Sequence, residues 1–140
     1  MPNRKFLIRC LVYLVIIVAV ASPFAWRQYR LETRIGAGEA FEVAFDKTLG
    51  TDPRFRGSDS GPLTSGAVFV DGHLESDADI KPFINALEKL RAEYPTWEMF
   101  VSVYAPSSKT TGVFLPDGSP VSWHTAPLHN TASQPAAASR

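Results

Sequence analysis

The apolar residues of the chain are concentrated in one run near its N-terminal end. From Phe6 to Trp26, 18 of 21 residues are apolar. The uncharged part, which starts at Cys10, is about 25 Å long as a helix, slightly short of a bilayer core. The apolar residues before Arg9 extend the helix to about 30 Å, with the Arg9 side chain reaching back towards the headgroups. The pattern therefore predicts a helix that contacts a lipid bilayer through residues 6–26.

Two interpretations of this run remain open. In the first, residues 6–26 are a permanent anchor, which Trp26 and Arg27 close at the membrane interface. In the second, the run is a signal peptide cleaved after Ala21, because residues 19–21 have the small side chains of a cleavage site. We favour the anchor, since apolar residues continue beyond that site.

The segment after the run predicts a helix and then a loop. Residues 27–49 have the spacing of a lead-in helix, which Gly36-Ala37-Gly38 interrupts before Phe41 and Phe45 resume its apolar side. Residues 50–66 are rich in glycine, proline and serine, and this composition predicts a linker loop.

The strongest helical pattern covers residues 79–94. Its apolar positions recur three and four residues apart, at Ile80, Phe83, Ile84, Leu87, Leu90 and Tyr94. Asp79 is in position to cap the helix, which places Pro82 in the first turn, where a missing N–H is harmless. Pro95 ends the helix. The pattern predicts a helix with one side buried against a sheet.

The segments around this helix have the patterns of strands. Residues 67–71 form a short apolar run that ends at Gly72. Residues 97–104 are rich in aromatic and β-branched side chains, and residues 112–124 predict a hairpin around a Pro-Asp-Gly-Ser turn. The tail, residues 125–140, is rich in alanine, serine and proline and predicts disorder.

These elements predict an α/β (α+β) fold for residues 67–124. We expect an N-terminal membrane-spanning helix followed by a small mixed sheet of β-α-β-β-β order with one or two packed helices. A strand, a crossover helix and a second strand imply a parallel, right-handed pair. The later strands join this pair in antiparallel orientation.

Charge divides the chain into two parts. Residues 1–34 have a net charge of +5, and residues 35–140 have a net charge of −5. An acidic domain argues against nucleic-acid binding, which needs a basic surface to neutralise phosphates. Basic residues flank the apolar run equally on both sides, and the short N-terminal tail favours an inside N-terminus.

The cysteine content bears on the compartment. The only cysteine, Cys10, lies within the apolar run, so the predicted domain forms no internal disulfide. Small extracellular animal domains usually contain several cysteines, whereas bacterial periplasmic domains often contain none. We therefore predict a single-pass protein of the bacterial inner membrane with its C-terminal domain in the periplasm. Cleavage after Ala21 would instead give a periplasmic or secreted protein.

Several polar residues are predicted to meet at one edge of the sheet. The carboxyl ends of parallel strands share an edge, which brings His73 and Glu75 beside the loop that contains Ser107 and Lys109. We expect the hairpin that returns to His124 to end there as well. These residues are candidates for binding. Most such residues only cap strands, and no spacing matches a zinc motif, so we assign no catalytic residue and no metal ligand.

The positions of two aromatic residues predict a second candidate binding surface. Phe100 and Tyr104 alternate with the apolar positions that suit the 79–94 helix, so they point to the other side of the sheet. One helix cannot cover both sides. Either Phe41 and Phe45 cover this second side, or a protein partner does.

The leading functional hypothesis is a membrane-anchored, non-enzymatic accessory or interaction protein of an envelope complex, with a protein partner and no cofactor. The first alternative is a soluble periplasmic binding protein or inhibitor released by cleavage. The second is a small enzyme or metal site at the edge that contains His73 and His124.

Overall fold

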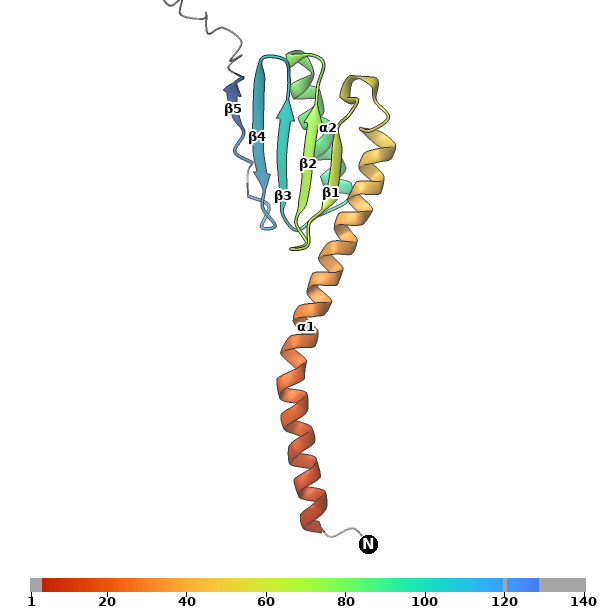
Figure 1. Ribbon diagram of the computed structural model, residues 1–140, viewed down its shortest axis with the longest axis vertical. Coiled ribbons are helices and arrows are strands. Elements are labelled where there is room, and N and C mark those ends of the chain that lie inside the picture. The colour runs from red at the N-terminus through yellow and green to blue at the C-terminus, as the bar shows by residue number, and fades with distance from the viewer. Residues whose placement is uncertain (1–3, 120, 129–140) are drawn as a thin grey trace, which may run out of the picture.

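The computed structural model describes residues 4–119 and 121–128. Its elements in chain order are α1 (Arg4–Thr48), the short 3₁₀ helix η1 (Pro53–Phe55), β1 (Asp59–Pro62), β2 (Val68–His73), η2 (Asp77–Asp79), α2 (Ile80–Glu93), β3 (Met99–Tyr104), β4 (Ser108–Phe114) and β5 (His124–Pro127). In Figure 1, α1 extends as a long stalk from a small domain that contains all the other elements.

The domain is built on a five-stranded mixed sheet of order β1-β2-β3-β4-β5. β2 and β3 are parallel, and α2 connects them, whereas the other three pairs are antiparallel. The predicted mixed α+β fold is therefore confirmed, including the β-α-β-β-β order from β2 to β5. β1 is an additional strand, which pairs with β2 through the register Asp59↔Asp71 to Pro62↔Val68.

The apolar stripe of α2 faces the sheet, as its spacing predicts. Phe83, Leu87 and Leu90 are buried. The helix begins slightly differently from the expectation, because Asp79 makes no capping hydrogen bond with its side chain. Instead the Oγ atom of Ser76 accepts a hydrogen bond from the backbone N–H of Ala78, at 3.2 Å, and so caps the 3₁₀ turn that precedes α2.

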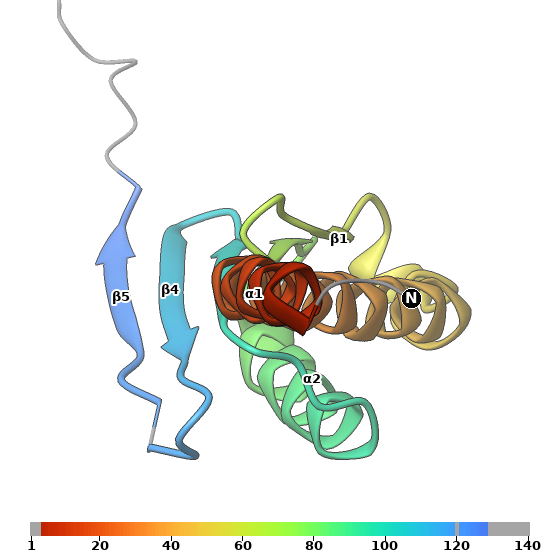
Figure 2. The ribbon, with the colours of Figure 1, turned by 90° about the horizontal axis from the view of Figure 1, so that it is seen from below.

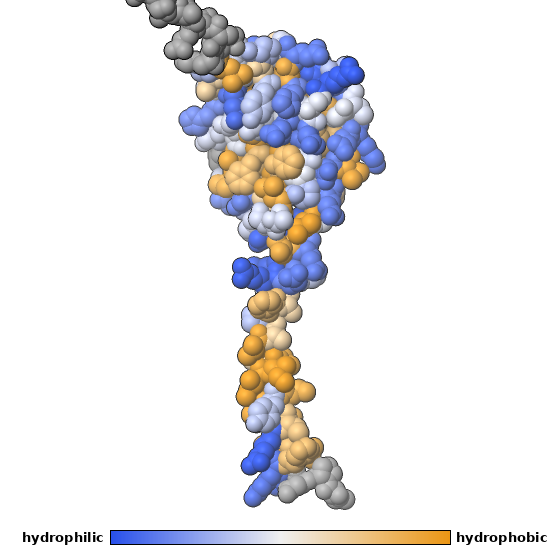
Figure 3. Space-filling view, viewed as in Figure 1, coloured by the Kyte–Doolittle hydropathy of each residue, from blue (hydrophilic) through white to orange (hydrophobic). Residues whose placement is uncertain are grey.

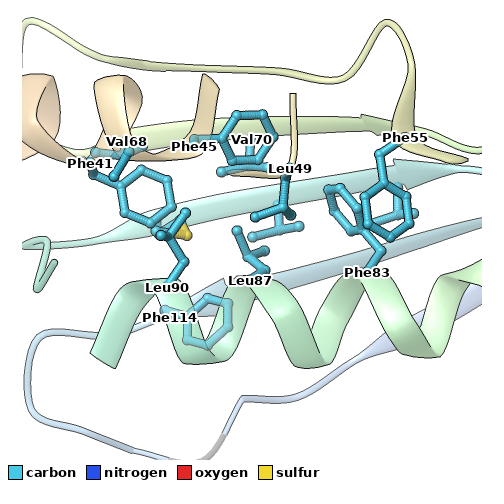
Figure 4. Packing of buried hydrophobic residues seen from close by; sticks show 14 of the residues in the cluster. Phe41, Phe45, Leu49, Phe55, Val68, Val70, Phe83, Leu87, Leu90 and Phe114 are labelled. Atoms are coloured by element: carbon cyan, nitrogen blue, oxygen red, sulfur yellow. The ribbon is translucent and has the colours of Figure 1, made fainter. Parts of the chain in front are cut away.

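The core lies between the sheet, α2 and the end of α1 (Figure 4). The last turns of α1 and the residue after them contribute Phe41, Phe45 and Leu49, all buried. The ring of Phe83 meets Phe45 edge-on, with 6.4 Å between centroids, and Phe55 at 5.1 Å. The stalk helix is therefore part of the domain core rather than a tether to it.

α1 is continuous across Gly36-Ala37-Gly38, where the sequence predicts an interruption. Gly38 is buried, and a Cβ atom there would lie 2.9 Å from the Cβ atom of Pro62 in β1. A glycine in a helix costs roughly 1 kcal/mol relative to alanine. Here its missing side chain allows α1 to lie against β1 and β2, and this packing compensates for the weak helix propensity.

Two further segments differ from the sequence-based expectations. Residues 50–66, expected to be a linker loop, contain η1 and β1. The last strand, β5, covers residues 124–127, whereas the sequence predicts the second strand of the hairpin at residues 120–124 and disorder from residue 125. The connection after Phe114 is therefore longer than a tight hairpin turn. In that connection Trp123 lies over Gly112, and its ring meets Phe114 edge-on at 5.7 Å. The rest of the predicted tail, residues 129–140, lies outside the described residues.

One helix among the described residues, α1, is long and apolar enough to cross a membrane. Its N-terminal position also suits a signal sequence. The side chains of residues 4–30 are exposed, whereas burial begins further along the helix (Figure 3). The apolar segment thus has no packing partner within the described part of the chain.

Candidate functional site

The sheet has one covered face and one open face. In Figure 2, α2 lies on one side of the sheet, and the end of α1 lies beside β1. On β3, Met99, Val101 and Val103 are buried towards these helices, whereas Phe100 is 43% exposed on the other face. No helix among the described residues covers that open face.

The alternative in which Phe41 and Phe45 cover the second face is wrong. Both side chains are fully buried in the cluster that contains Phe83, Leu87 and Met99, on the face that α2 covers. α1 reaches this cluster because it packs on the same side of the sheet as α2. Phe100 and Tyr104 therefore lie on a face that both helices leave open.

The part of the open face nearest the stalk is apolar. Register aligns Phe69, Phe100 and Val113 across β2, β3 and β4, and we call these residues the apolar row. The Phe69 ring leans over Gly61 in β1, where an added Cβ atom would lie only 3.0 Å from it. Figure 3 shows an orange patch on the face of the domain towards the viewer. Beside this row, Leu115 is 41% exposed.

A polar row crosses the middle of the open face. Register aligns five residues across all the strands: Asp59, Asp71, Ser102, Thr111 and His124. Between the polar and apolar rows lies a shallow depression of about 480 Å³, which Phe100, Thr111 and His124 help to line. This surface offers carboxylates, hydroxyl groups and an imidazole beside exposed aromatic rings.

A third row of the open face lies at the carboxyl ends of β2 and β3, farthest from the stalk. Register aligns His73, Tyr104 and Lys109 in this row. The rings of His73 and Tyr104 stack, with 5.3 Å between centroids and 12° between planes. The Lys109 ammonium lies 4.7 Å from the Tyr104 centroid. These contacts hold the tyrosine ring between two neighbours and leave it half-buried, which limits its rotamers.

The loop that follows β2 meets the β3–β4 turn at this edge. The hydroxyl of Ser108 donates a hydrogen bond to Oδ1 of Asp77, at 2.9 Å. Hydrogen bonds from Ser107 and then Ser108 lower the pKa of the Asp77 carboxyl below its ordinary value. Glu75 lies exposed in the same loop. The edge is therefore held together by Asp77, which the sequence does not single out.

The predicted cluster comes together only in part. His73 and Lys109 meet around Tyr104, and Ser107 lies at the same edge, with its carbonyl accepting from the N–H of Leu128. His124 lies in the polar row, because β5 begins there and runs towards the edge. It is three strands from His73, or roughly 14 Å at a strand spacing of about 4.8 Å. That separation is too large for one metal ion bound by both histidines.

Several residues of the open face are absent from the sequence-based candidates. Phe69 belongs to a continuous apolar run, 67–71, which hides the alternation that marks an exposed position. On β4, Thr111 alternates with the buried Thr110, so both faces of that strand look polar. The open face as a whole follows only from the register of the sheet. No protein-family model, curated protein or solved structure matches the chain.

Proposed function

We propose that this chain is a single-pass, membrane-anchored interaction protein. Residues 6–26 of α1 span the bilayer, and the C-terminal domain is exported to the bacterial periplasm. There the open face binds a protein partner that belongs to an envelope complex. The domain acts by binding, without catalysis or a cofactor.

The open face carries this proposal. Phe69, Phe100 and Val113 place apolar groups next to the polar row and to a restrained tyrosine, Tyr104. Aromatic side chains in the centre of a patch with polar neighbours are typical of binding hot spots. A five-stranded sheet with one helical layer leaves its second face for solvent or a partner. The exposed aromatic rings favour the partner.

The continuity of α1 supports the anchor. The helix runs without interruption from the apolar segment into the domain core, where Phe41 and Phe45 are fully buried. The proposed cleavage site after Ala21 lies within this helix. Cleavage would retain every residue of α1 that packs in the core, so a released domain is the outcome that competes with the anchor.

The compartment rests on the sequence. The domain contains no cysteine, which is typical of bacterial periplasmic domains. Intact-mass measurement of the chain from bacterial membranes tests the anchor. A chain that still begins at its N-terminal Met supports it, whereas a mature chain beginning at Ser22 overturns it and indicates release.

Site-specific photocrosslinking in intact cells tests the binding face. A photoreactive residue in place of Thr111 lies in the open face, and one in place of Asn85 lies on the exposed side of α2. We expect one crosslinked protein band from position 111 that position 85 does not give. The double substitution Phe100→Ser and Tyr104→Ser should remove that band while the domain stays folded.

The matched control replaces Lys81 and Asn85, exposed on α2, with serine and should leave the band unchanged. Equal crosslinking from positions 111 and 85 would overturn the proposal. A band that survives the Phe100 and Tyr104 substitutions would overturn it as well.

A further inference from the structure

The helix α1 and the loop between β1 and β2 enclose a basic cleft just above the apolar segment. The cleft measures about 540 Å³ and is lined by Arg27, Arg30 and Arg34 on α1 and by Thr64 and Ser65 on the loop. The three arginines are three and four residues apart, so they lie on one side of the helix. Helix and loop together thus form a concave surface with three cations and two hydroxyl groups.

The arginines of this cleft have no carboxylate partners in the part of the chain that the structure describes. No acidic oxygen lies within 4.0 Å of their guanidinium nitrogens. The nearby Glu32 on α1 accepts instead from Nε2 of Gln28, at 3.5 Å. The positive charge of the basic cleft is therefore available for an anionic ligand.

Aromatic rings hold two of the guanidinium groups. Arg30 lies 5.0 Å from the centroid of Trp26, and Arg34 lies 3.5 Å from that of Trp97. A cation–π contact uses the face of the guanidinium and leaves its N–H donors in the plane. Those donors match the oxygens of a phosphate, which arginine binds in a two-pronged manner.

The height of the basic cleft above the apolar segment favours a lipid headgroup as its ligand. In the proposed anchored state the apolar segment ends at Trp26, so Arg27 and Arg30 lie about 1.5 and 6 Å above it along the helix. The headgroup layer of one leaflet is about 5–7 Å thick. The Arg34 backbone lies about 12 Å above Trp26, beyond this layer, but long helical side chains lean towards the helix N-terminus and so back towards the layer. Leu31 and Trp26 add an apolar wall at the membrane side.

We propose that the basic cleft binds the phosphate of an anionic phospholipid headgroup. This inference rests on the anchor of the proposed function and adds a ligand to it. The arginines and the Thr64 and Ser65 hydroxyls bind the phosphate oxygens, and the Trp26 and Leu31 side chains contact the glycerol end of the lipid. The missing carboxylate partners make the cleft selective for an anionic lipid over a zwitterionic one. A bound lipid would fix the domain against the membrane surface.

Native mass spectrometry of the full-length chain in detergent tests this site. The probes are phosphatidylglycerol and phosphatidylcholine with identical acyl chains, added separately. We expect tighter binding of phosphatidylglycerol, with the preference reduced about fivefold for each of Arg27→Gln and Arg30→Gln. That factor corresponds to the ~1 kcal/mol that a juxtamembrane arginine contributes. Both side chains are exposed, so these variants should keep the fold.

Two controls define the site. Arg56→Gln removes the same charge from an exposed position beyond the far end of α1 and should leave the preference unchanged. Arg4→Gln does so at the other end of the apolar segment and should also have no effect. Equal binding of the two lipids would overturn the proposal, as would a preference that only Arg4→Gln reduces.

A soluble source of the same chemistry is tested by competition. Inorganic phosphate at about 10 mM, roughly ten times the concentration that would half-saturate a site with a Kd of about 1 mM, should not displace phosphatidylglycerol. Displacement would show that the cleft takes free phosphate and would overturn the lipid assignment. The intact mass recorded in the same spectra reports on the anchor separately, because a chain beginning at Ser22 contradicts the anchor whatever the lipid counts are.

Discussion

The two faces of the sheet are made of alternate residues of the same strands, yet helices cover one face and leave the other open. On β3, Val101 and Val103 are sealed beneath two helices, while Phe100 and Tyr104 lie on the open face. The helices α1 and α2 come from different parts of the sequence, and both pack on the same face of the sheet. The difference indicates that the open face is not a core face that lacks its covering helix. The α1 residues that could cover it, Phe41 and Phe45, are buried on the opposite face.

The largest effect is expected on the covered face. Leu87→Asp should destabilise the domain by about 4 kcal/mol or more, because an unpaired carboxylate would enter the cluster with Phe45 and Phe83. Thermal unfolding followed by circular dichroism measures it. The control Lys89→Asp changes an exposed position two residues away and should cost no more than about 0.5 kcal/mol. An unchanged transition in the Leu87 variant would contradict the placement of α2.

A second pair of variants compares the faces within one strand. Val101→Ser with Val103→Ser should cost about 3–4 kcal/mol, since two apolar side chains are lost and two hydroxyl groups are buried. Phe100→Ser with Tyr104→Ser should cost less than about 1 kcal/mol, mainly the contacts of Tyr104 with His73 and Lys109. Chemical denaturation gives both values. Similar losses for the two pairs would show that both faces are core.

The packing of α1 is tested at its two neighbouring glycines. Gly38→Ala should destabilise the domain by about 1–2 kcal/mol, because the new Cβ atom would lie 2.9 Å from Pro62 and 3.1 Å from Val68. At Gly36 no atom lies within 4 Å, so Gly36→Ala should stabilise the helix by up to about 1 kcal/mol. Melting temperatures that move in the same direction would argue against the close approach of α1 to β1.

The smallest effect is a pH dependence at the edge of the open face. Hydrogen bonds from Ser107 and Ser108 lower the pKa of Asp77 in the folded state. The ionised carboxyl therefore stabilises the fold above the unfolded pKa of about 4, and this contribution disappears as the pH falls through the lower, folded value. Asp77→Asn should be slightly less stable than the natural chain at pH 7. The difference between their melting temperatures should shrink at pH 3, and a constant difference would contradict the role of the carboxyl.

The covered face is largely predictable from sequence, because it depends on patterns of single elements. The stripe through Phe83, Leu87 and Leu90 has a helical period that no strand shares. The helical crossover between residues 71 and 97 then favours a parallel pair, since parallel strands need a long connection of this kind. These local patterns are sufficient to give the mixed sheet and its helical layer.

The open face depends on the register of the strands, and the basic cleft depends on how closely the β1–β2 loop packs on α1. Local sequence patterns contain neither kind of information. The sequence around Ser60 has low strand propensity, and β1 forms there because β2 offers an unpaired edge. Likewise, the arginines after Trp26 look like ordinary flanking charges. The packing at Gly38, together with the close approach of Gly66 to Arg34, brings the β1–β2 loop, with Thr64 and Ser65, against them.

The unbroken α1 also sets the direction in which the domain faces. Between the proposed bilayer surface at Trp26 and the first buried residue, Gly38, the chain is regular helix, so rotation and height are linked. Each residue inserted in this segment would raise the domain by about 1.5 Å and turn the open face by about 100° around the membrane normal. Seven inserted residues would return the face to within about 20° of its original heading while lifting it about 10 Å. The length of the stalk thus sets the height and the heading of the domain together, whereas a flexible linker would leave both undefined.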